Sequence, residues 1–200
     1  VMIGEYVRDA QGVEIFRPQA AIGNIRLWMR SRELNCRREE QWLAKSILEA
    51  ARLLPDWPRY ASQMKMKPDA DDVPHVNHVR GSGDWIVHPW PREISGMIWV
   101  DQNGDARVQP REISFHAFDD ADEVLLDSGL NVTICVPKRR EQDGGVYRIP
   151  RTGFNAVGAP VYRWDKMQKL TDAVVDGQLV DPDGNLLGFG SLNRPDGSAI

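Results

Sequence analysis

Residues 97–118 read MIWVDQNGDARVQPREISFHAF, and this stretch contains the pattern that decides the fold. Two short apolar runs, at 97–100 and 113–118, flank a polar segment at 101–112. Short runs rich in β-branched and aromatic residues, bounded by turn residues, are typical of β-strands. The stretch therefore predicts two strands joined by a polar loop.

Further short apolar runs follow at intervals of roughly ten residues, as in proteins built from many short strands. They lie at 123–126, 132–136, 146–149, 160–164, 174–175, 179–180 and 186–189. Turn residues separate them, for example Asp127-Ser-Gly129 and Asp143-Gly-Gly145. The pattern favours a mainly β fold, either a propeller-like array or another antiparallel array of many strands.

The first half of the chain has a different character. Residues 3–16 alternate around the turn at 9–12, which predicts a hairpin. Apolar residues recur at helical spacing within 31–54, which predicts one helical segment that Pro55 ends. Residues 55–95 are rich in Pro, Asp, Gly and His and show no periodicity. We therefore expect a region at 1–95, a hairpin plus a helical and irregular segment, and a β-rich calcium-loop region at 96–200.

The polar segment 101–112 has the ligand spacing of a twelve-residue calcium loop. Asp101, Asn103, Asp105 and Glu112 occupy positions one, three, five and twelve, and Arg107 at position seven would contribute its backbone carbonyl. Short oxygen-bearing side chains at alternate positions can converge on one centre, and a final Glu can close the cage with both oxygens. The sequence therefore predicts a Ca²⁺ site formed by these five residues.

One position of the loop departs from the calcium pattern. Position six is normally glycine because the chain turns sharply there, but here it is Ala106. A Cβ in that conformation costs on the order of 1 kcal/mol. The alternative interpretation is a polar turn held by hydrogen bonds from its own Asp and Asn side chains.

Other metal chemistry has weaker support in the sequence. His75 and His78, with Asp71 and Asp72 nearby, are suitable transition-metal ligands but lack a defined spacing and a reliable third ligand. We interpret them as surface or hydrogen-bonding residues.

Composition excludes several classes of protein. The net charge of −4 argues against nucleic acid as the main partner, because phosphate binding needs a basic face. No apolar run approaches the length that spans a bilayer, and we expect neither a membrane span nor a signal peptide within this sequence. Two cysteines, Cys36 and Cys135, are too few for a disulfide scaffold, although a bridge between them is an open alternative. The chain starts at Val1 and stops on a turn-like stretch, so we expect it to be part of a longer protein.

Three stretches together resemble segments of large extracytoplasmic bacterial β-propeller-like proteins, in which an EF-hand-type calcium loop decorates one blade. They are the segment from Trp99 to Glu112, RTGFNAVGAPVY at 151–162 and GFGSLNRPDGS at 188–198. The resemblance covers residues 96–200. It implies repeated four-stranded blades, a periplasmic or secreted location, and a binding or scaffolding role with no catalytic residues.

The leading functional hypothesis is a calcium-stabilised, non-catalytic β-rich subunit or domain that binds other protein subunits. No catalytic constellation is convincing, and the seven Trp residues suit interfaces as well as cores. One alternative is a carbohydrate-active hydrolase using Asp84, beside Trp85, or Glu93. Another is a structural component of a phage or secretion assembly.

Overall fold

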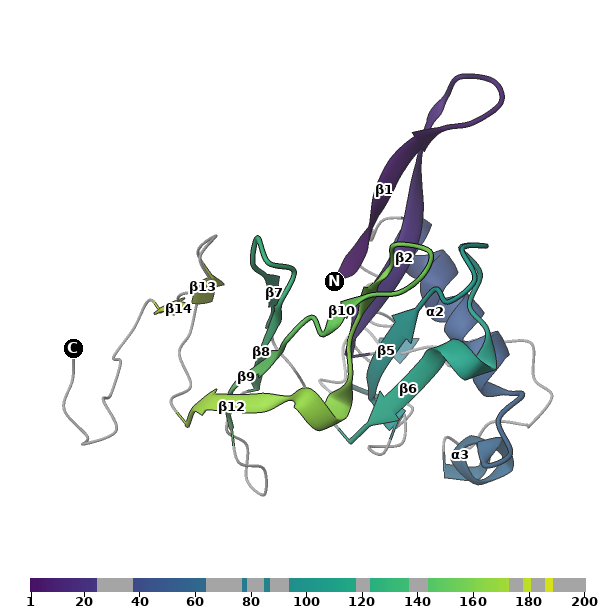
Figure 1. Cartoon of the computed structure of the whole chain (residues 1–200). Helices are drawn as coiled ribbons and strands as arrows, with labels where there is room; N and C mark the ends of the chain where they lie inside the picture. The colour runs from purple at the N-terminus through teal and green to yellow at the C-terminus, as the bar shows by residue number, and fades with distance from the viewer. Residues whose placement is uncertain are drawn as a thin grey trace.

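The computed structural model describes residues 1–24, 38–63, 77–78, 85–86, 94–117, 123–136, 144–172, 178–180 and 186–188. Over these residues the protein is mainly β, and it has two α-helices (Figure 1). This confirms the fold class predicted from the short apolar runs. Two four-stranded antiparallel sheets contain most of the strand residues.

The first sheet has the strand order β1-β2-β5-β6. Its strands are β1 (Met2–Arg8), β2 (Glu14–Asn24), β5 (Gly96–Val100) and β6 (Ile113–His116). Its central pairing joins β2 to β5, with Ala20 opposite Val100. The sheet therefore spans the boundary that we expected between residues 95 and 96.

The predicted hairpin is confirmed as β1 and β2, and its turn is held by Asp9. The Asp9 carboxylate accepts the N–H groups of Gln11 (2.9 Å) and Val13 (2.8 Å), and Gly12 takes a positive φ of 80°. The second strand is longer than expected because Ala20–Asn24 also pair with β5. The end of the hairpin projects away from the rest of the molecule (Figure 1).

The second sheet has the order β12-β9-β8-β7. Its strands are β7 (Glu123–Leu126), β8 (Val132–Val136), β9 (Gly145–Ile149) and β12 (Gln168–Thr171). Three were expected from apolar runs, but β12 was not, because it is an exposed, mostly polar edge strand without an apolar run. β8 lies between β7 and β9, and all five of its residues are buried.

Shorter elements complete the described part of the chain. They are β3 (Asn77–His78) paired with β4 (Trp85–Ile86), β10 (Gly153–Phe154) paired with β11 (Pro160–Val161), β13 (Gln178–Val180) paired with β14 (Leu186–Gly188), and the 3-10 turns η2 (Pro110–Glu112) and η3 (Trp164–Lys166). The run expected as a strand at 160–164 thus ends early and continues as a turn.

The helical prediction at 31–54 corresponds to α2 (Arg38–Ala51), while residues 31–37 lie outside the described residues. A second helix, α3 (Trp57–Gln63), forms where we expected irregular structure, so that part of the prediction was wrong. The signals for α3 were Asp56 just before the helix and Pro58 in its first turn. Trp57 and Ala61, four positions apart, are both buried in the core.

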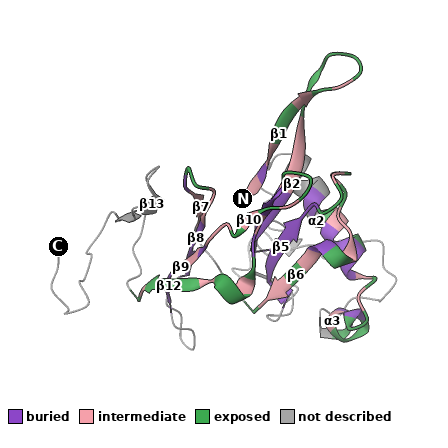
Figure 2. Ribbon diagram, viewed as in Figure 1, coloured by how far each residue is buried: buried purple, intermediate pink, exposed green. Residues whose placement is uncertain are grey.

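The first sheet is covered on both faces, and β5 shows this most clearly. Its Met97 and Trp99 belong to one core cluster with Leu43 and Ile47 of α2. Its Ile98 and Val100 belong to another cluster with residues of β8. Alternate residues of a strand point to opposite faces, so all of β5 is buried (Figure 2). The protein therefore has a helical layer, a central sheet and a second sheet.

A propeller-like repetition of blades is not confirmed in the described residues. None of the described helices is long and apolar enough to cross a membrane.

Candidate metal centre and adjacent groove

The predicted calcium loop leaves the buried strand β5 and returns through η2 into β6. Its first candidate ligand, Asp101, is 1% exposed and directly follows the last residue of β5. Its last candidate ligand, Glu112, is 4% exposed and is the final residue of η2. Since β5 and β6 are paired neighbours, the sheet itself brings the two ends of the loop together.

Asp101 organises the first half of the loop through three backbone N–H groups. Its Oδ1 accepts from Asn103 (3.2 Å) and Gly104 (2.7 Å), and its Oδ2 accepts from Ala106 (2.9 Å). Carboxylate oxygens are strong acceptors of backbone N–H groups, and these bonds make it possible to bury Asp101. The loop is therefore folded around this side chain.

Ala106 adopts the backbone conformation that the calcium pattern requires at position six. Its φ is 55°, in the left-handed region that glycine normally occupies, and Gly104 also has a positive φ, 77°. The Cβ of Ala106 makes this conformation costly by about 1 kcal/mol. Its hydrogen bond to Asp101 helps to offset that cost.

The exposed side of the loop is formed by Asn103 and Asp105. The Asp105 Oδ1 accepts the Arg107 N–H (2.8 Å), and its Oδ2 accepts from Asn103 Nδ2 (3.0 Å) and Gln109 Nε2 (2.9 Å). Desolvation acts to raise the pKa of Asp105, but these hydrogen bonds and the Arg107 charge outweigh it and lower the pKa below 3.8. Asp105 is therefore anionic at neutral pH, as a calcium ligand must be.

Glu112 faces the interior. Its Oε1 accepts the Gln102 N–H (3.0 Å), and its Oε2 accepts the Trp99 indole N–H (3.2 Å) and the Gln109 N–H (3.2 Å). The bond to Gln109 is half of a capping box at the start of η2. Glu112 thus joins the second half of the loop to the core.

Distant segments also hold the loop in place. Asp101 donates its N–H to the Gln19 carbonyl of β2 (2.8 Å), and its own carbonyl accepts from Asn155 Nδ2 (2.7 Å). The Arg17 guanidinium donates to the Gly104 carbonyl. Arg17 lies 87 positions from Gly104 along the chain, and Asn155 lies 54 positions from Asp101. Such distant partners were not identified from the sequence.

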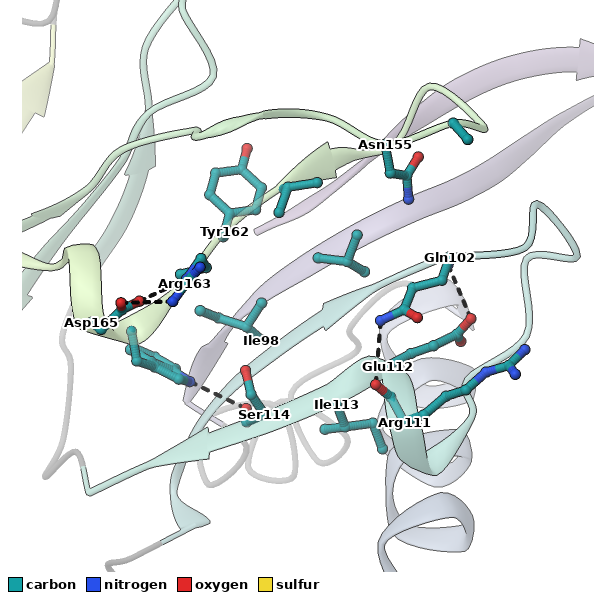
Figure 3. A pocket seen from close by; sticks show the side chains of 14 residues that line it. Ile98, Gln102, Arg111, Glu112, Ile113, Ser114, Asn155, Tyr162, Arg163 and Asp165 are labelled. Carbon is teal, nitrogen blue, oxygen red and sulfur yellow. Dashed lines mark hydrogen bonds and ion pairs between the residues drawn. The ribbon is translucent and has the colours of Figure 1, made fainter.

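An open groove of about 710 Å³ lies beside the loop (Figure 3). Its floor includes Ile98, Val100 and Val161, and its lining is mostly apolar. Figure 3 shows Gln102 and Glu112 on one side of the groove and Tyr162 on the other. Burial raises the pKa of the Tyr162 phenol, which donates to the Leu130 carbonyl (2.7 Å). One wall of the groove is therefore built from the predicted calcium loop.

Trp164 also lines the groove. Its ring stacks on His116, with 5.0 Å between ring centroids, and its indole N–H donates to the Ser114 carbonyl (3.3 Å). Arg163 and Asp165 form an ion pair beside it (2.8 Å). These contacts fix the η3 segment against β6.

The chemistry of the loop suits a hard cation, but its carboxylates do not gather into a metal cage. Asp, Asn and backbone oxygens are the donors that Ca²⁺ prefers. Among the residues that the structure describes, however, no group of three or more His, Cys, Asp or Glu side chains is arranged to hold a metal ion. Calcium ligation by Asp101, Asn103, Asp105, Arg107 and Glu112 stays a prediction. The hydrogen bonds described above are the ones expected for the alternative interpretation, a polar turn held by its own side chains.

The other residues singled out from the sequence fall largely outside the described part of the chain. These residues are Cys36, Asp71, Asp72, His75, Asp84 and Glu93. The backbones of His78 and Trp85 lie opposite each other in the β3–β4 pair. Cys135 is buried on β8.

Comparison of the chain with protein-family models, with curated proteins and with solved structures gave no match.

Proposed function

We propose that this chain is a calcium-stabilised, non-catalytic β-rich domain that binds other protein subunits through the groove beside its 101–112 loop. The observation that carries the proposal is the double role of the loop. It contains the five candidate ligands, and its Gln102, Arg111 and Glu112 line the groove. A cation that rigidifies the loop would thereby fix the shape of a binding surface.

The charge of the loop supports a cation as its ligand. Asp101 and Glu112 are both almost fully buried, and no ion pair with a described basic residue neutralises either one. Their hydrogen bonds make the burial possible but leave the negative charge of the loop without a counter-charge, which a cation would supply. Asp105 adds a third negative charge on the exposed side. We expect a Kd of roughly 0.1–1 mM, the range of single calcium modules in extracellular proteins.

The groove has the composition of a protein-binding surface. Its lining is mostly apolar and also contains amide and charged side chains. Such an arrangement is typical of interfaces, in which an apolar centre is surrounded by a polar rim. Its open form suits a side chain or short segment of a partner subunit.

Calcium is expected to raise the melting temperature of the full chain. A ligand that binds only the native state at a hundred times its Kd stabilises it by about 2.7 kcal/mol. For a chain of this size that corresponds to roughly 5–11 °C. Differential scanning calorimetry with added calcium or with excess chelator measures the shift.

Two aspartates provide matched variants for this experiment. Asp105→Asn should reduce the calcium-dependent shift to about half or less at the same calcium concentration. Asp9→Asn, which alters a carboxylate that holds the hairpin turn, should preserve it. An identical melting temperature for the wild-type chain in calcium and in chelator would contradict the proposal.

A bulky charge in the groove is expected to prevent partner binding. Ala156 lines the groove and is exposed, so Ala156→Arg should reduce recovery of the partner from the native source by about tenfold or more, equivalent to about 1.4 kcal/mol. The same substitution at exposed Ala10, in the hairpin turn, is the control. Quantitative affinity purification in calcium and in chelator measures the effect. Equal recovery by both variants would exclude the groove as the binding surface.

A further inference from the structure

The contacts of Glu112 limit what this residue can do for a cation. A carboxylate has about four lone-pair positions on its two oxygens, and three of those of Glu112 are already used. Ligating a cation with both oxygens would require the side chain to turn away from its present donors. The Oε2 atom would lose at least its two present hydrogen bonds, from the Trp99 indole and the Gln109 backbone N–H.

The donor that would lose most is the Trp99 indole N–H. Trp99 is 0% exposed and lies in the core cluster with Leu43 and Ile47 of α2. The structure shows Glu112 as the acceptor for its N–H group. A buried N–H left without an acceptor is strongly disfavoured. The backbone N–H of exposed Gln102, in contrast, can find a water molecule in place of Glu112.

The first half of the loop retains free acceptor capacity. The Asp101 Oδ2, the Asn103 Oδ1 and the Asp105 Oδ1 each accept a single hydrogen bond. No described residue donates a hydrogen bond to the Arg107 carbonyl. Each of these oxygens can therefore face a cation without losing its present partner.

We infer that Glu112 is the positioning residue that anchors the loop to Trp99, and that it does not close the calcium cage with both oxygens. This inference rests on the proposed function, which supplies the cation. Asp101, Asn103, Asp105 and the Arg107 carbonyl would hold that cation, and water would complete its coordination shell. It departs from the expectation, drawn from spacing alone, that the residue at position twelve is the main ligand.

The test compares calcium affinity with the environment of the Trp99 indole in the full chain. Isothermal titration with CaCl₂ gives the Kd of the wild-type chain and of three variants: Glu112→Gln, Asp105→Asn and the exposed control Glu49→Gln. Nuclear magnetic resonance of ¹⁵N-labelled tryptophan follows the indole N–H signals. The Trp99 signal is identified by its absence from Trp99→Phe.

Five results are expected if the inference holds. Glu112→Gln should change the Kd by less than about threefold, whereas Asp105→Asn should raise it by about tenfold or more, as expected for loss of a charged ligand. Glu49→Gln should have no effect. Calcium should leave the Trp99 signal of the wild-type chain in place, and Glu112→Gln should move that signal even without calcium.

A tenfold or greater rise in Kd for Glu112→Gln, or a calcium-induced shift of the wild-type Trp99 signal, would overturn the inference. If Glu112→Gln does not fold, the wild-type titration decides alone. If no variant binds calcium, the proposed function fails. The anchoring role is then still decided by the calcium-free Trp99 signal, which an unconnected Glu112 would leave unmoved in Glu112→Gln.

Discussion

Replacement of Trp99 by alanine is expected to lower the free energy of unfolding by about 3–5 kcal/mol, the usual cost of removing a buried tryptophan. Trp99 is fully buried between α2 and the first sheet, so the change opens a cavity in the core. It also removes one of the three donors of the buried Glu112. Because small domains are stable by only about 5–15 kcal/mol, much of that margin would be lost. Urea denaturation measures the change.

Trp99→Phe separates the two contributions. Phenylalanine retains an apolar ring in the core but lacks the indole donor, so the loss should be smaller, about 1–3 kcal/mol. If both variants cost the same, the hydrogen bond to Glu112 would account for the whole effect and packing for none. A loss below about 1 kcal/mol for the alanine variant would contradict the buried position of Trp99.

Asp101→Asn is expected to destabilise the chain by about 1–3 kcal/mol and to abolish calcium binding. The new amide group would face at least one of the backbone N–H groups of Asn103, Gly104 or Ala106. Two donors in contact leave a hydrogen bond unmade in a buried site. Urea denaturation in chelator measures the stability, and calcium titration measures the binding.

Asp105→Asn is the matched comparison for Asp101→Asn. Asp105 is exposed, so its replacement should change the calcium-free stability by less than about 0.5 kcal/mol, yet it should impair calcium binding. Together the two variants separate the stability of the folded loop from its affinity for the cation. Equal stability losses for the two variants would contradict the central place of Asp101 in the loop.

The fold class could be predicted because most strands carry their own local signal. The apolar runs at 132–136 and 146–149 mark strands buried in the second sheet, β8 and β9. In contrast, β12 lies on a sheet edge, where exposed polar residues are tolerated, and therefore shows no apolar run. The pairing of β2 with β5 also has no local signature, since packing of distant segments determines it.

The candidate site could be predicted only in its local part. Spacing placed Asp101, Asn103 and Asp105 in one loop, and the structure shows them linked by hydrogen bonds within that loop. Spacing also suggested that Glu112 turns toward a cation, but its position depends on Trp99, which belongs to the preceding strand and the core. The groove could not be predicted at all, because it is lined by segments that meet only in the folded chain.

The pairing of β2 with β5 has a consequence for the order of folding. The β1–β2 hairpin is local, and such hairpins form within about 1–10 μs. The first sheet, however, cannot be completed until Gly96–Val100 has left the ribosome, long after Ala20–Asn24. In the interval the nascent chain presents a strand edge without its neighbour, a surface that is prone to aggregation. We therefore expect synthesis of this protein to pass through a vulnerable stage that ends only when β5 and its neighbour β6 have both emerged.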